Sequence, residues 1–126
     1  MINKLKIKNE LIEIAQKQFN SARQDSEIEE LKLELQILKD LPDQLPQNQR
    51  EVVIGALVYI LFNQQKKYYY IAPTAGGTML RIDHQVVLVI SVFSPIGNAI
   101  LGLAVGDFFE IGEREKKRQY QILEIS

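Results

Sequence analysis

The chain has no cysteine, no tryptophan and a single histidine, and each shortage excludes a kind of site. Without cysteine there is neither a disulfide framework nor a thiolate metal site. The histidine, His84, stands in a predicted turn with no nucleophile at motif spacing, which argues against a catalytic pair. The sequence therefore shows no catalytic group of its own, and we expect the protein not to be an enzyme.

An excess of one charge and a long hydrophobic run are also missing. The 15 basic and 16 acidic side chains nearly balance, so nothing marks a general nucleic-acid binder. Residues 1–16 are charged throughout and lack the apolar core of a signal peptide. The longest apolar run, Val52 to Phe62, is too short to span a membrane. We expect a cytoplasmic protein without membrane contact and without direct sequence-specific nucleic-acid binding.

The composition changes sharply at residues 42–50, PDQLPQNQR. Two prolines and several glutamines there stop a helix and do not start a strand. We interpret this segment as a linker between a unit at residues 1–41 and a unit at residues 51–126.

The first unit has the apolar periodicity of two helices. Apolar residues recur at three- and four-residue spacings in two sets: Ile12, Ala15, Phe19 and Ala22, then Ile28, Leu31, Leu35 and Leu38. This pattern predicts an antiparallel coiled-coil hairpin with its tip near residues 21–27. Ser26 and Glu29 have the spacing of a capping box for the second helix. A continuous helix that dimerises is the alternative.

The second unit has the pattern of strands. Val52 to Phe62 and Val86 to Phe93 are apolar on both faces, which predicts central strands. Tyr68–Tyr70 form an aromatic strand, in which alternation places Tyr69 opposite its neighbours. Polar turns are predicted at residues 63–67, 75–77, 83–85 and 113–117. The predicted fold class is α+β: the helical hairpin, followed by an antiparallel sheet wrapped around a short helix.

The short helix is predicted within the segment Ile90 to Ile111, ISVFSPIGNAILGLAVGDFFEI. Ser94 suits a helix N-cap, and Pro95 fits the first turn because its missing N–H would be unpaired there. Ile96, Ile100 and Leu101 give the helix an apolar face, and Gly102 suits a left-handed stop.

The ordered motifs SPIG, AILG and VGD in this segment resemble the C-terminal signature of the bacterial GreA/GreB transcription factors. The similarity extends from Val52 to Ile125 through IAP, AGG and the closing YQILEI, and it covers the FKBP-like domain of that family. The sequence is most similar to the Bacteroidetes-type or Rnk-like variants with a shortened N-terminal coiled coil.

The resemblance implies a transcription elongation factor that binds bacterial RNA polymerase at the secondary channel. The family's docking contact falls on Phe93, Ser94 and Pro95, where Phe93 replaces a residue that is commonly polar. An exposed Phe93 would be an anchor, whereas a Phe93 turned into the core would weaken the assignment. Transcript cleavage, where it occurs, is carried out by the polymerase, which the factor assists.

Acidic residues near the predicted tip are candidates for that assistance: Asp25, Glu27, Glu29 and Glu30. The resemblance implies that Asp25 and Glu29 share a Mg²⁺ ion with the polymerase, with no cofactor bound stably by the factor alone. The same acids also suit the first turn of the second helix, and the acidic-glycine tip motif of cleavage factors is missing. A Rnk-like competitor without cleavage activity, or a coiled-coil oligomerisation module without polymerase binding, are the alternatives, and monomer and dimer both stay open.

Overall fold

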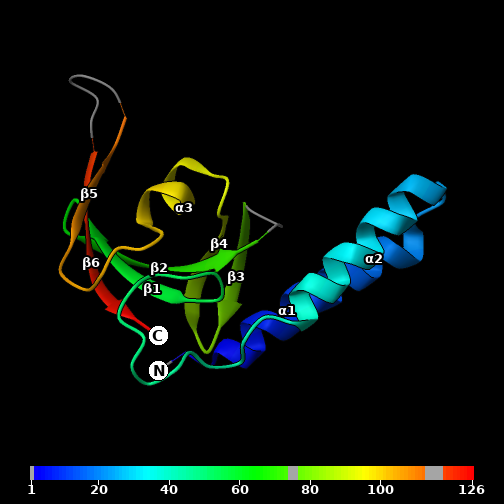
Figure 1. Ribbon diagram of the computed structural model, residues 1–126, viewed down its shortest axis with the longest axis horizontal. Coiled ribbons are helices and arrows are strands. Elements are labelled where there is room, and N and C mark those ends of the chain that lie inside the picture. Colours follow the sequence, from blue (N-terminus) through cyan, green and yellow to red (C-terminus); the bar gives the residue numbers. More distant parts are fainter. Residues whose placement is uncertain (1, 74–76, 113–117) are drawn as a thin grey trace.

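The computed structural model describes residues 2–73, 77–112 and 118–126. A helical hairpin projects from one end of a β-sheet unit (Figure 1). The helices are α1 (Lys4–Ser21), α2 (Asp25–Lys39) and α3 (Pro95–Ile100). The strands are β1 (Leu57–Phe62), β2 (Gln65–Ala72), β3 (Thr78–Ile82), β4 (Gln85–Ser91), β5 (Phe108–Ile111) and β6 (Arg118–Ile125). The α+β fold class is as predicted.

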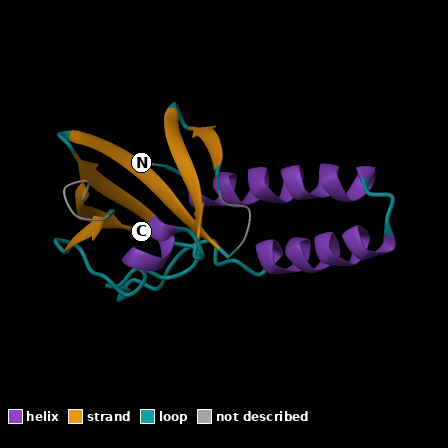
Figure 2. Cartoon of the chain, turned by 90° about the horizontal axis from the view of Figure 1, so that it is seen from above, coloured by secondary structure: helices purple, strands orange, loops and turns teal. Residues whose placement is uncertain are grey.

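Helices α1 and α2 lie side by side and antiparallel within one chain (Figure 2). Their facing sides bury Ile7, Leu11, Ala15, Leu31, Leu35 and Leu38. The predicted seam is confirmed on α2 at Leu31, Leu35 and Leu38, but on α1 the buried side runs through Ile7, Leu11 and Ala15. The other predicted seam residues are only half-buried: Ile12, Phe19, Ala22 and Ile28. None of the described helices has both the length and the apolar composition needed to cross a membrane.

The predicted capping box at the start of α2 is wrong. The helix begins at Asp25 with Gln24 as N-cap, and no side chain caps it. Ser26 therefore lies inside the first turn, where its hydroxyl cannot take the N-cap position opposite Glu29. Instead, the carboxylates of Asp25 and Glu27 lie in the first turn, where negative charge interacts favourably with the helix dipole.

The sheet has six strands in the order β3-β4-β2-β1-β6-β5. Its neighbouring strands are antiparallel except for β2 and β4, which are parallel. The prediction of a wholly antiparallel sheet is wrong for this pair. The reason is that β3 forms a hairpin on the outer side of β4, so β4 returns beside β2 in the same direction.

The predicted strand from Val52 is also too long, because β1 begins at Leu57. Gly55 has a φ of 90°, which side-chain-bearing residues rarely adopt, and this turn separates Val52 from the strand. The turns predicted at 63–67 and 83–85 are present but shorter, with φ positive at Asn63, Gln64, Asp83 and His84. Residues 65–67 belong to β2, and residue 85 begins β4. The predicted turn at 113–117 and most of that at 75–77 lie outside the described residues.

The two faces of the sheet bury two separate cores. Tyr70 packs into the core beneath the hairpin, and its neighbour Tyr69 packs into the core beneath α3. Along β4, Val87 and Val89 face the hairpin core, whereas Leu88 and Ile90 pack against the α3 core. The alternation predicted for the tyrosines is thus confirmed, and it gives each face of the sheet its own covering element.

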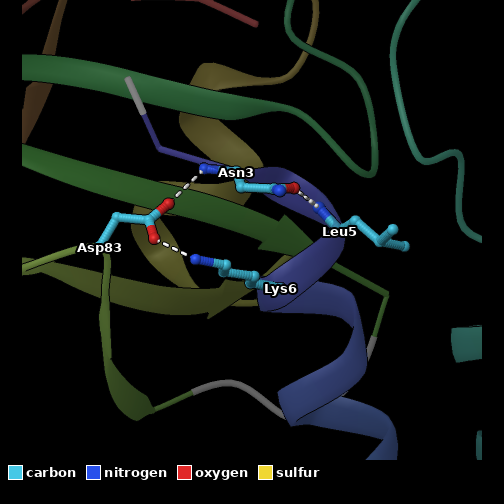
Figure 3. Close-up of polar contacts among 4 residues, drawn as sticks. All are labelled: Asn3, Leu5, Lys6 and Asp83. Atoms are coloured by element: carbon cyan, nitrogen blue, oxygen red, sulfur yellow. Dashed lines mark hydrogen bonds and ion pairs between the residues drawn. The ribbon is translucent and has the colours of Figure 1, made fainter.

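Asp83, in the turn between β3 and β4, fastens the start of α1 to the sheet (Figure 3). Its carboxylate accepts a hydrogen bond from the backbone N–H of Asn3 at 3.0 Å and pairs with the Lys6 ammonium. The hydrogen bond from Lys6, and next that from Asn3, lower the pKa of Asp83. An anion is thereby held against the N-terminus of α1, where the helix dipole favours it.

Two further lysines of α1 fix the base of the hairpin. The buried Lys4 donates its Nζ to the main-chain oxygen of Ser126 at 3.0 Å, and burial lowers the pKa of Lys4 to about 8. One turn later, Lys8 Nζ donates to the carbonyl of Leu41 at 2.7 Å and to Asp43 at 3.0 Å. The base of the hairpin is therefore bonded to the residue after β6, to the β3–β4 turn and to the segment that begins the linker.

We expect Asp83→Asn to lower the stability of the protein at neutral pH, because asparagine keeps the left-handed turn but loses the charge opposite Lys6. Because the pKa of Asp83 is lowered in the folded state, its stabilisation is present above the ordinary aspartate pKa of about 3.9 and is lost as the pH falls through the lowered value. Urea unfolding at several pH values measures this. The midpoints of variant and parent should differ at pH 7 and converge in acid, while Glu13→Gln, in an exposed pair within α1, serves as the control.

Candidate functional site

The loop between β4 and α3 is folded around Ser91. The Ser91 hydroxyl accepts a hydrogen bond from the backbone N–H of Phe93 at 3.1 Å. The Ser91 carbonyl accepts two more, from the backbone N–H of Ser94 at 3.0 Å and from the Ser94 hydroxyl at 2.7 Å. Ser94 Oγ in turn accepts from the N–H of Gly97 at 3.0 Å, which caps α3 as predicted.

This network presents Phe93 to solvent. The Phe93 side chain is 85% exposed, the highest fraction among the large exposed hydrophobic residues that the structure describes. Pro95 is also exposed and occupies the first position of α3, while Ser94 is half-buried. The alternative in which Phe93 turns into the core is therefore wrong. Ser94 acts chiefly within the loop, because its hydroxyl already donates and accepts there.

Gly97 is the residue that permits this compact loop. A Cβ atom at position 97 would lie 2.0 Å from the carbonyl oxygen of Ser91, far inside contact distance. Only glycine allows α3 to approach the end of β4 so closely. Within the SPIG motif, Ser94 and Gly97 therefore have structural roles, whereas Pro95 is exposed to solvent.

A groove of about 830 Å³ lies beside this loop. Phe93, Pro95 and Ile96 line one side, and Ile111 and Tyr120 of β5 and β6 line another. The Tyr120 ring stacks between Phe62 and Phe109, with centroid separations of 4.6 and 5.0 Å.

The second wall of the groove was not predicted from the sequence, in which Ile111 and Tyr120 are recognisable only as parts of closing strands. Alternation of apolar residues along both strands was the available signal, but it does not show that the strands end beside the loop at Phe93.

The candidate tip acids lie in another part of the molecule. Asp25, Glu27, Glu29 and Glu30 are exposed at the start of α2, at the end of the hairpin remote from the sheet. Glu29 Oε1 lies 3.9 Å from Lys32 Nζ, a loose exposed pair. Among the described residues, no group of three or more histidine, cysteine, aspartate or glutamate side chains is placed to hold a metal ion. Asp25 and Glu29, one helical turn apart, can at most supply part of a coordination shell.

Comparison with protein families bears directly on this architecture. The model of the C-terminal domain described as "Transcription elongation factor, GreA/GreB" matches residues 47–126, which include the loop, the groove and the whole sheet. The chain belongs to the GreA/GreB family. The resemblance inferred from SPIG, AILG and VGD is confirmed, and the protein is a Gre-like transcription elongation factor.

Solved structures similar to this chain come from the same family. GreA factor homolog 1 (Gfh1) of Thermus thermophilus is 21% identical, with a TM-score of 0.45, over 97% of this chain and 89% of that one. The GreA/GreB factor of Nitrosomonas europaea is 17% identical, with a TM-score of 0.47, over 92% of both chains. No curated protein matches. The family assignment rests on the match to residues 47–126.

We expect Gly97→Ala to destabilise the protein by about 2 kcal/mol or more, because the added methyl group must displace α3 or the end of β4. Urea denaturation followed by circular dichroism measures the loss. Asn98→Ala, an exposed change in the same helix, is the control and should alter stability little. A Gly97→Ala variant as stable as the parent would show that α3 does not need this close approach.

Proposed function

We propose that this Gre-like factor binds bacterial RNA polymerase at its secondary channel and modulates elongation. In this proposal, the loop Phe93–Pro95 is the docking site for polymerase, and the helical hairpin points into the channel. The observation that carries the proposal is the exposure of Phe93 at 85% on a loop fixed by Ser91 and Ser94.

Phe93 combines a large apolar surface with a backbone that is already held in place. A phenylalanine offers roughly 150–250 Å² of surface, and burying it is worth about 2–3 kcal/mol. Its loop is already held by hydrogen bonds to the hydroxyl and the carbonyl of Ser91, so little conformational entropy is lost on binding. Aromatic side chains seated in a partner's pocket are typical of residues that dominate binding energy.

The length of the hairpin bears on what the factor does after binding. At 1.5 Å per residue, the 18 residues of α1 extend about 27 Å and the 15 residues of α2 about 22 Å. In the cleavage-stimulating form of the proposal, Asp25 and Glu29 at the tip supply oxygen ligands to a Mg²⁺ ion held mainly by the polymerase. Such an ion lowers the pKa of a bound water, and the polymerase remains the enzyme.

A specific observation favours a second form, in which the factor binds polymerase and blocks other Gre factors without stimulating cleavage. Asp25 and Glu27 lie in the first turn of α2, which has no side-chain cap, so their charges already have a structural role. The arms of the hairpin are also short. In this form the tip acids are dispensable for the effect on transcription.

Binding is tested with Phe93→Ser. We expect at least about a 10-fold loss of affinity for purified bacterial RNA polymerase, measured by biolayer interferometry, because an anchor residue is removed without disturbing a core. The control is Phe108→Ser, which changes a phenylalanine that is 57% exposed in β5. Unchanged binding of Phe93→Ser would contradict the docking site. If the parent protein does not bind polymerase and sediments as a dimer, the oligomerisation module is the better description.

The effect of the tip acids is tested on backtracked elongation complexes. If the factor stimulates cleavage, the protein shortens the transcript, and Asp25→Ala combined with Glu29→Ala lowers the cleavage rate at least about 10-fold while binding is kept. If the factor is a competitor, neither the parent nor the double variant shortens the transcript, and both inhibit a cleavage-active Gre factor equally. The two results are mutually exclusive.

A further inference from the structure

An apolar strip of the sheet lies uncovered next to Phe93. We define the β4 strip as four residues on one face of β3 and β4: Met79, Val86, Leu88 and Ile90. Leu88 and Ile90 are half-buried and pack at the edge of the α3 core. Met79 is 66% exposed and Val86 44% exposed. Clustered apolar exposure of this kind marks interaction surfaces more often than single exposed residues do.

The strand register places these residues together. Met79 is directly opposite Leu88, and Arg81 is directly opposite Val86, so each pair lies on the same face. Val86, Leu88 and Ile90 alternate along β4 on that face. The strip therefore runs from the Val86 end of β4 to Ile90, which lines the groove beside Phe93.

Two cationic side chains stand at the far end of the strip. Lys67 pairs with Ile60, a member of the α3 core, so it is on the same face of the sheet. It precedes Tyr68, whose parallel partner is Val87, and this places Lys67 beside Val86. Arg81 flanks Val86 from the other side. Val86 is thus bracketed by a lysine and an arginine, both exposed.

We propose that the polymerase contact extends from Phe93 along the β4 strip to Val86, and that the polymerase segment bound there carries apolar side chains beside an acidic group. This inference rests on the proposed function. The continuity of the strip with the Phe93 groove identifies the same partner for both. The cations at Lys67 and Arg81 specify the charge of the partner segment, because an acidic group there gains favourable interactions at the rim.

The apolar part is tested with the double variant Met79→Ser and Val86→Ser in the full chain. We expect its affinity for purified bacterial RNA polymerase to fall about 10-fold or more, since buried contact area is lost at two points. The matched control is Val105→Ser with Ile54→Ser, in the turns before β5 and β1, where the exposures are 57% and 41%. Both double variants remove exposed apolar surface. A loss of polymerase affinity confined to the Met79/Val86 variant therefore shows that the position of the apolar surface matters, and not general solubility.

The charged part is tested with neighbouring lysines. Lys67→Glu should weaken binding, more at low salt than at high salt, because it opposes an acidic partner group. Lys66→Glu is the control, since Lys66 pairs with Leu61 and points to the other face. Equal effects of the two lysine changes would overturn the charge assignment.

The outcomes separate this inference from the proposed function. If Phe93→Ser weakens binding but the Met79/Val86 pair does not, the β4 strip is not part of the interface and the polymerase proposal stands. If the parent protein does not bind polymerase, both fail. If sedimentation shows a dimer that the Met79/Val86 pair abolishes, the strip is a self-association surface and the inference is overturned.

Discussion

The main-chain oxygen of Ser91 is the point on which the functional end of the molecule depends. It ends β4, accepts two hydrogen bonds from Ser94, and leaves room for nothing larger than a glycine at position 97. These contacts set where α3 begins, and α3 in turn covers one core through Ile100. They also turn Phe93 away from that core. Burial of the helix and exposure of the phenylalanine therefore have a common cause.

Strand β4 links this loop to the hairpin. On one face, Val87 and Val89 belong to the core that receives α1. On the other face, Leu88 and Ile90 pack against the α3 core, and Ile90 lines the groove. The turn that begins β4 carries Asp83, which holds the N-terminus of α1. The loop that carries Phe93 and the turn that holds the base of the hairpin therefore lie at opposite ends of one strand.

Much of the fold was predictable because it follows from local rules. The α3 cap at Ser94 and the stop at Gly102 need only neighbouring residues, and the hairpin seam follows from helical spacing. The predictions that were wrong depended on distant strand partners or on the position of one helix boundary. The parallel pairing of β2 with β4 is decided by where β3 lies, and the wrong cap at Ser26 is a shift of two positions from the observed N-cap, Gln24. The role of Asp83 was hidden because a turn aspartate gives no sign of the helix it will hold.

Composition and geometry lead to different expectations about charge. A net charge of −1 argues against broad attraction to an acidic partner, and for the chain as a whole that argument holds. Strand alternation, however, sends Lys66 and Lys67 to opposite faces, and pairing brings Arg81 to the same side as Lys67. Charge is therefore concentrated beside Val86 by the sheet and not by the sequence. A nearly neutral protein can in this way carry a local pair of cations at one end of its sheet.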